Sequence, residues 1–204
     1  MRCVPTNNHK TPESIAAQYP ASWLSPPDGN TRFAAQTIAA KAGAKIFEIK
    51  AEKPYSTNYR TCCDEAKPEC YGKQLRPIQK IEGLNLVQYD VIFVGTPNWW
   101  GTMAPPVRTF LSQNAAVLKG KTVCLFQTNG GGGMQRCGKE FAELVPNSKV
   151  LPAQALSGSS VRSRDFSVRH SEKRVSLFGN LFSELLDNPA QLIHGHAEMS
   201  QRLR

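Results

Sequence analysis

Gly29-Asn30-Thr31 is a segment that could bind a phosphate group. It leads directly into an alanine-rich stretch with helical periodicity. A helix N-terminus offers free backbone N–H groups and a positive dipole end to an anion, so no lysine is required. A simple helix cap, with Asn30 or Thr31 as the N-cap residue, explains the same residues. The segment alone therefore does not decide between a phosphate site and a cap.

Two adjacent tryptophans provide a more specific signal. They lie in Thr96-Pro97-Asn98-Trp99-Trp100-Gly101-Thr102, which follows the apolar run 91–95. Neighbouring side chains of a strand point in opposite directions. At least one indole must therefore face the loop surface, where it can cover a flat ring system. The alternative is that both indoles anchor the loop.

A glycine-rich segment, Thr128-Asn129-Gly130-Gly131-Gly132-Gly133, follows a second apolar run at 121–128. Glycine has no Cβ, so the backbone N–H groups of such a segment can approach a ligand closely. A flexible connection is the alternative. The position of the segment at the carboxyl end of a strand favours a binding site.

The remaining pattern alternates between helices and strands. It predicts helices over 31–42, 105–113, 134–144 and 171–185, and strands over 44–49, 91–95, 121–128 and 150–156. The stretch 51–86 is polar and mostly loop, with a weak helix near 59–69. Such alternation predicts an α/β fold, in which helices cover both faces of a parallel sheet and ligands bind beyond the carboxyl ends of the strands.

Taken in this order, the three segments resemble the flavodoxin family. The resemblance runs over roughly residues 29–161 and is most specific at Trp99-Trp100-Gly101-Thr102, the loop of small bacterial flavodoxin-like proteins. It implies a flavodoxin-like three-layer sandwich with a parallel sheet in the order 2-1-3-4-5. It also implies one non-covalently bound FMN as the cofactor.

The resemblance further implies which residues bind FMN. The first segment would hold the phosphate, and the second and third segments would lie on the two sides of the isoalloxazine ring. The cofactor-binding residues expected on this basis are Gly29, Asn30, Thr31, Thr96, Pro97, Asn98, Trp99, Trp100, Gly101, Thr102, Thr128, Asn129, Gly130, Gly131 and Gly132. No catalytic residue and no metal ligand is expected.

The N-terminal segment departs from the family pattern. Family members begin with an apolar strand at the centre of the sheet, whereas residues 1–28 contain several prolines and no apolar strand. The first strand is therefore expected to be atypical or missing. Pro26 and Asp28 stand where the family usually has hydroxyl residues that donate to the phosphate, and Asp28 would place a negative charge beside it. We divide the chain into an atypical segment 1–24, an FMN-binding domain 25–186 and a polar tail 187–204.

Composition excludes several other classes of protein. No stretch approaches the roughly 18 apolar residues of a membrane helix, and no apolar secretion signal is seen, so a cytoplasmic location is expected. The net charge of +9 is spread along the chain, so a nucleic-acid partner is not expected. Cys62, Cys63 and Cys70 cluster, but adjacent cysteines suit one tetrahedral metal ion poorly, and reduced thiols are expected.

Electron transfer through FMN is the predicted function, with a redox protein or a small electron acceptor as the partner. The sequence does not separate an electron carrier from a small flavin-dependent NAD(P)H or quinone reductase, and it does not set the oligomeric state. One alternative is a flavodoxin-like scaffold or interaction module that has lost flavin binding. Another is a nucleotide-phosphate enzyme, because 133–139 fits G-x-x-x-x-G-K, although Glu140 occupies the position that requires Ser or Thr.

Overall fold

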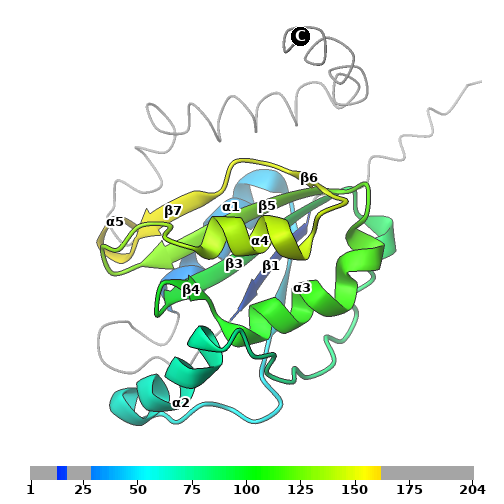
Figure 1. Cartoon of the computed structure of the whole chain (residues 1–204). Helices are drawn as coiled ribbons and strands as arrows, with labels where there is room; N and C mark the ends of the chain where they lie inside the picture. The colour runs from blue at the N-terminus through cyan, green and yellow to red at the C-terminus, as the bar shows by residue number, and fades with distance from the viewer. Residues whose placement is uncertain (1–12, 18–28, 162–204) are drawn as a thin grey trace, which may run out of the picture. The chain divides into compact units, whose positions relative to one another are not determined.

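The computed structural model describes residues 13–17 and 29–161, in which strands and helices alternate (Figure 1). The strands are β1 (Glu13–Ala17), β2 (Lys45–Ile49), β3 (Val91–Trp99), β4 (Thr102–Met103), β5 (Thr122–Asn129), β6 (Lys149–Val150) and β7 (Gln154–Ser157). The helices are α1 (Asn30–Ala42), α2 (Tyr59–Tyr71), α3 (Pro105–Leu118), α4 (Cys137–Leu144) and α5 (Gly158–Val161), with a short 3-10 helix η1 (Leu86–Gln88).

The sheet has the predicted order. Strands β2, β1, β3, β5 and β6 lie side by side in parallel, and β7 also pairs with β5 in parallel. Two short strands, β6 and β7, thus occupy the place of the single strand predicted over 150–156. The exception to the parallel arrangement is β4, which is antiparallel to the end of β3.

The first strand, expected to be atypical or missing, is present as β1. It pairs with β2 on one side and β3 on the other, with Ile15 opposite Phe47 and Val94. Its residues lie between Pro12 and Pro20, so every one of them keeps the N–H group that a central strand needs. The central strand is therefore present, although its sequence is atypical.

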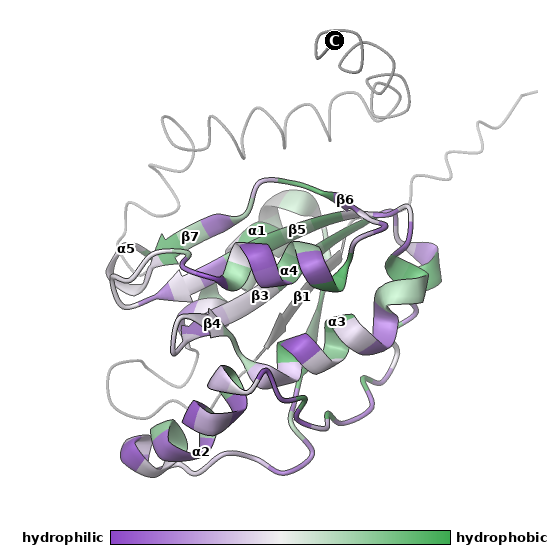
Figure 2. Cartoon of the chain, viewed as in Figure 1, coloured by the Kyte–Doolittle hydropathy of each residue, from purple (hydrophilic) through white to green (hydrophobic). Residues whose placement is uncertain are grey.

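The sheet is the middle layer of a sandwich. Helix α1 lies on one face, and α3 and α4 lie on the other (Figure 1). Buried side chains of β3 and β5 pack against α3 and α4 in one core, which includes Ile92, Leu125, Phe110, Leu111 and Phe141. Hydrophilic residues predominate on α2 and on the outward face of α4 (Figure 2).

Helix boundaries follow local chemistry. Helix α1 ends at Gly43, whose φ of 62° is left-handed, as its predicted role as a C-cap requires. Helix α3 begins with Pro105 and Pro106, where the missing N–H groups have no intrahelical partner to lose. Helix α2 begins at Tyr59, as predicted, where the Asn58 side chain caps it by accepting from the Thr61 N–H at 3.1 Å, and it extends two residues beyond the predicted end, to Tyr71.

Several predictions fall outside the described residues. These are the helix at 171–185, the tail 187–204, and the contribution of Pro26 and Asp28 to the phosphate segment. The domain limits at residues 24 and 186 stay predictions. Within 13–17 and 29–161, no helix has the length and apolarity to cross a membrane.

Candidate functional site

Helix α1 begins at Asn30, and Gly29 is its N-cap residue without a side-chain capping bond. The alternative in which Asn30 or Thr31 serves as the N-cap is therefore wrong. The first N–H groups of a helix have no partner within the helix. The positive end of α1 is thus formed by the residues that the sequence assigns to a phosphate.

Thr31 and Thr128 join the start of α1 to the end of β5. Their Oγ1 atoms lie 2.6 Å apart, so one hydroxyl donates to the other. Both residues are buried. This contact places the N-terminus of α1 beside the glycine-rich segment at the carboxyl end of the sheet, where parallel α/β sheets bind their ligands.

Asn129 fixes the shape of the glycine-rich segment. Its Oδ1 accepts from the N–H groups of Gly131 at 2.8 Å and Gly133 at 3.2 Å, and its Nδ2 donates to the Leu156 carbonyl at 3.2 Å. Gly131 and Gly133 have φ values of 122° and 68°, which glycine adopts readily. The segment is therefore a turn held by its own hydrogen bonds. This argues against the alternative of a flexible connection.

Gly130 is not required by this turn. Its φ is not positive, and a Cβ added to it would meet no atom of the described residues within 4 Å. A Cβ added to Gly29 would likewise meet no atom of the described residues within 4 Å. Both glycines therefore leave their backbone open to close approach by a bound molecule.

The two tryptophans have different surroundings. Trp99 ends β3 and packs edge-on against Tyr55, with ring centroids 5.0 Å apart. Trp100 follows in the turn between β3 and β4, where its φ of 53° is unusual for a bulky residue. Its side chain is 39% exposed. One indole thus anchors the loop and the other lies at the surface, as the opposed directions of adjacent side chains predict.

Asn98 connects the tryptophan loop to the glycine-rich turn. Its Nδ2 donates to the Gly133 carbonyl at 3.0 Å, and its Oδ1 accepts from the Gly101 N–H at 2.9 Å. Pro97 pairs with Thr128 in the β3–β5 ladder. The structure therefore brings the three segments singled out in the sequence to one edge of the sheet.

Three further expected binding residues also make contacts within the fold. The Thr96 hydroxyl accepts from the Ala104 N–H at 3.1 Å. The buried Thr102 hydroxyl donates to the Glu140 carboxylate. A Cβ on Gly132 would lie 2.9 Å from Gln135 Nε2, so the absence of a side chain at this position makes room for Gln135.

A fourth segment, 157–159, reaches the same edge of the sheet and was missed in the sequence. It begins at Ser157, the last residue of β7, and the Ser157 and Ser159 hydroxyl oxygens lie 2.8 Å apart. A Cβ on Gly158 would come within 2.4 Å of Asn30 Nδ2, so this glycine allows close contact with the start of α1. The rule that sites follow the carboxyl ends of strands could have found it, because 157–159 directly follows the last predicted strand, 150–156.

Comparisons with known proteins agree with this arrangement. A family model described as Flavodoxin matches residues 21–168. The chain belongs to the flavodoxin family. A flavoprotein from Lactobacillus acidophilus NCFM, solved in complex with FMN, is similar in structure at a TM-score of 0.60 and 21% identity, over 72% of this chain and 93% of that chain.

Two further flavoprotein structures resemble this flavodoxin-family chain. A putative flavoprotein from Bacteroides uniformis ATCC 8492 has a TM-score of 0.61 and 20% identity, over 80% of this chain and 98% of that chain. Another from Bacteroides eggerthii DSM 20697 has a TM-score of 0.57 and 23% identity, over 77% and 98%. At these identities the likeness concerns the fold.

The G-x-x-x-x-G-K match does not form a phosphate loop in this member of the flavodoxin family. Helix α4 begins at Cys137, so Gly138 and Lys139 lie within its first turn rather than in the preceding loop. Glu140 is buried and faces Arg108, with 3.5 Å between Oε2 and Nη2. The position that would need a hydroxyl for Mg²⁺ thus belongs to a buried ion pair.

The clustered cysteines lie on α2 as free thiols. Burial raises the pKa of Cys62 from 9.0 to about 11 and that of Cys70 from 9.0 to about 12. Both groups therefore carry a proton at neutral pH. Within the described parts of the chain, no group of three or more His, Cys, Asp or Glu residues could hold a metal ion.

Proposed function

We propose that this protein binds FMN non-covalently at the carboxyl edge of its sheet and transfers electrons through it. The contact between Thr31 and Thr128 is the observation that carries the proposal, because it joins the anion-binding end of α1 to the glycine-rich turn. The similar flavoprotein from Lactobacillus acidophilus, which was solved with FMN, supports the choice of ligand. FMN supplies one- and two-electron chemistry, and the chain supplies binding and electrostatics.

The start of α1 fits a phosphate group. Its first N–H groups and its dipole favour an anion. The first two residues of the helix, Asn30 and Thr31, have an amide and a hydroxyl that could also donate to a phosphate. Among the described residues, none lies within 4 Å of a Cβ added to Gly29, so a phosphate can approach its backbone. These residues would bind the FMN phosphate without a lysine or an arginine.

The second and third segments fit a flat ring. Trp100 presents a partly exposed indole on a loop whose shape is fixed by Asn98. Gly130, in the third segment, has no atom of the described residues within 4 Å of the position of an added Cβ, which leaves room for a ligand beside its backbone. An aromatic face and backbone donors are the groups that would orient an isoalloxazine ring and exclude water from it.

The alternative is a flavodoxin-like scaffold that has lost flavin binding. It rests on Pro26, Pro27 and Asp28, whose types are unfavourable beside a phosphate. The presence of β1 in the centre of the sheet favours the FMN proposal, because the phosphate segment comes after this strand in the chain and forms the start of α1.

Gel filtration with added FMN tests the proposal. The full chain is incubated with excess FMN and separated from free ligand, and the visible spectrum of the protein fraction is recorded. We expect flavin absorbance to travel with the protein, and stepwise reduction to change it reversibly. A colourless protein fraction from a folded sample would favour the scaffold instead. Oxidation of NADH or NADPH by the FMN-loaded protein would distinguish a reductase from an electron carrier.

A further inference from the structure

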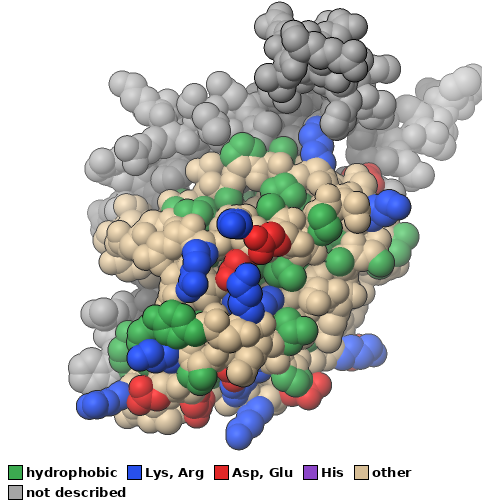
Figure 3. Space-filling model, viewed as in Figure 1, with side chains coloured by type: hydrophobic (Ala, Val, Ile, Leu, Met, Phe, Trp, Pro, Cys, Tyr) green, Lys and Arg blue, Asp and Glu red, His purple; other side chains and the backbone are tan. Residues whose placement is uncertain are grey.

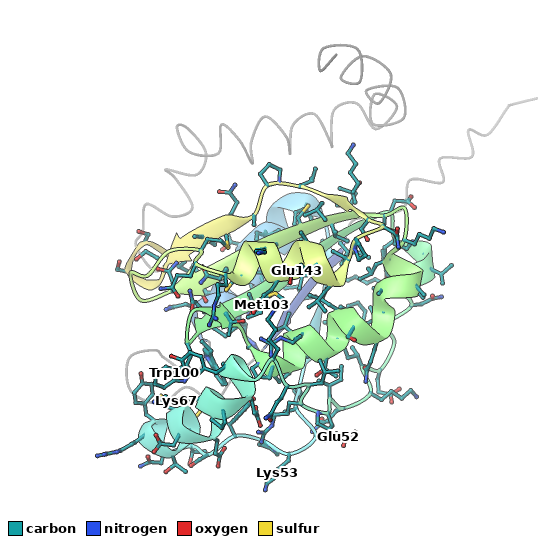
Figure 4. The ribbon with its side chains drawn as sticks, viewed as in Figure 1. Glu52, Lys53, Lys67, Trp100, Met103 and Glu143 are labelled. Atoms are coloured by element: carbon teal, nitrogen blue, oxygen red, sulfur yellow. The ribbon has the colours of Figure 1, made fainter. Side chains whose placement is uncertain are left out.

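Two exposed aromatic side chains lie together beside the proposed flavin site, with a cation next to each. The rings of Tyr71 and Trp100 have centroids 6.1 Å apart and are 57% and 39% exposed. Lys67 Nζ lies 5.1 Å from the Trp100 ring centroid, and Arg136 Cζ lies 6.0 Å from the Tyr71 ring centroid. Figure 4 shows Lys67 and Trp100 side by side. These four residues are called the basic aromatic patch below.

Lys67 and Arg136 have no ion-pair partner in the part of the chain that the structure describes. Among the described residues, no carboxylate lies within 4.0 Å of the Lys67 or Arg136 charged groups. Asp64, one turn before Lys67 on α2, forms no such pair with it. Glu143 on α4 pairs with Lys73 instead, at 3.7 Å. Lys67 and Arg136 are therefore exposed cations that an acidic partner could pair with.

The aromatic centre of the patch is held in a fixed position. Arg136 donates from Nη2 to the Trp100 carbonyl at 3.2 Å and from its backbone N–H to the Gly101 carbonyl at 3.0 Å. Trp100 is kept in a left-handed conformation within this turn. A preorganised aromatic side chain loses little freedom on binding, and Trp, Tyr and Arg are the residue types that dominate binding energy at protein interfaces.

We propose that the basic aromatic patch docks an acidic electron-transfer protein. The inference rests on the proposed function, because Trp100 belongs both to the patch and to the segments assigned to FMN. A net charge of +9 would steer an acidic partner toward this chain. Lys and Arg side chains lie next to hydrophobic side chains on the face that contains α2 and α4 (Figure 3).

The step served by this docking is a one-electron transfer. A partner with a [2Fe–2S] cluster ligated by cysteines would lose one electron and become oxidised. The bound FMN would gain that electron and become reduced. The carboxylates around the cluster of the partner would face Lys67 and Arg136, and apolar surface would cover Trp100 and Tyr71.

Stopped-flow reduction of the FMN-loaded full chain by a reduced acidic [2Fe–2S] ferredoxin tests the proposal. The second-order rate constant is measured from low to high salt for the wild type, Lys67→Glu and Arg136→Glu. The matched control is Lys119→Glu, which changes charge equally at the opposite edge of the sheet, where β5 begins. Reduction by photoreduced 5-deazariboflavin, which is uncharged, reports on the flavin site alone.

We expect the wild-type rate constant to fall steeply as salt is raised, because salt screens the charges that steer the partner. At low salt, Lys67→Glu should lower the rate constant by at least about fivefold. Arg136→Glu should act in the same direction, whereas Lys119→Glu should change the rate constant less than about twofold. Reduction by deazariboflavin should be unchanged in Lys67→Glu. Equal effects of Lys67→Glu and Lys119→Glu, no dependence on salt, or no reduction by the ferredoxin would overturn the docking proposal. A chain that binds no FMN would instead overturn the proposed function.

Discussion

Arg108 Nη2 lies 3.5 Å from Glu140 Oε2, and both side chains are buried. The same Nη2 donates to the Thr102 hydroxyl at 2.9 Å, and Nη1 donates to the Gln74 carbonyl at 3.0 Å. The Glu140 carboxylate also accepts from Thr102 and from the Met103 N–H at 3.3 Å. This ion pair thus ties α3, α4 and the segment after α2 to β4, which closes the tryptophan loop.

Removing the guanidinium should destabilise the fold strongly. Arg108→Met leaves the Glu140 charge buried without its partner, so we expect the free energy of unfolding to fall by about 3–5 kcal/mol. Urea unfolding measures this change. Replacing both residues, Arg108→Met with Glu140→Leu, should recover most of the loss. A change in Arg108→Met no larger than in the exposed control Lys119→Met would contradict the role of the ion pair.

The hydroxyl pair of Thr31 and Thr128 should matter for ligand binding. Thr128→Val keeps the shape of the side chain but removes one partner of the 2.6 Å hydrogen bond. The freed Thr31 hydroxyl and the loosened start of α1 should weaken FMN binding by about tenfold, equivalent to about 1.4 kcal/mol. Quenching of FMN fluorescence provides the affinity. The control is Thr37→Val, which removes an exposed hydroxyl of α1 that donates to the Phe33 carbonyl; an equal loss there would point to helix stability instead.

Two glycines of the same turn should respond differently to alanine. Gly130 has no positive φ and no described atom near its added Cβ, so Gly130→Ala should leave the free energy of unfolding within about 0.5 kcal/mol. Its methyl group should nevertheless lower FMN affinity, because it occupies the space left for the ligand. Gly131→Ala places a Cβ at a φ of 122° and should destabilise the fold by about 1 kcal/mol or more. Unchanged FMN affinity in Gly130→Ala would remove this residue from the site.

Stability should decline at alkaline pH. Burial raises the pKa of Cys62 to about 11 and that of Cys70 to about 12, above their ordinary value of 9.0. The folded state therefore holds these protons more tightly than the unfolded state does. Their contribution to stability is complete below pH 9 and is lost as the pH rises toward 11 and 12. Urea unfolding at pH 8 and pH 10.5 should show the decline, and Cys70→Ala should show a smaller one; a pH-independent midpoint would contradict this account.

The buried parallel strands β3 and β5 follow from their apolar runs, and the edge that holds the site follows from the alternation of strands and helices. The order of the strands is implied by the resemblance to the flavodoxin family, and the structure has that order. Strand β1 does not follow in the same way. Ile15 is its one large apolar residue, and its position depends on pairing with β2 and β3, which lie far away in the chain. The start of α4 could not be predicted either: the sequence pattern places it at residue 134, whereas the helix begins at Cys137. Gln135 has a left-handed φ of 44°, and glutamine is not a residue type that indicates such a turn.

Side-chain contacts within the site were the least predictable part. The sequence marks Trp99 and Trp100 as a pair whose members point apart, but Tyr55, which decides that Trp99 is the anchor, comes from the polar stretch read as loop. Glu140 is similar. Its residue type excludes a magnesium-binding phosphate loop, whereas its pairing with Arg108 depends on the packing of α3 against α4.

Equilibrium dialysis of the full chain against FMN and against riboflavin tests the central claim most directly. The two ligands share the ring, and FMN alone carries the phosphate that the start of α1 would bind. We expect one FMN per chain, bound about tenfold or more tightly than riboflavin, as a helix N-terminus acting on an anion implies. Failure of the folded chain to retain FMN, or equal affinity for the two ligands, would contradict the phosphate site at Gly29-Asn30-Thr31.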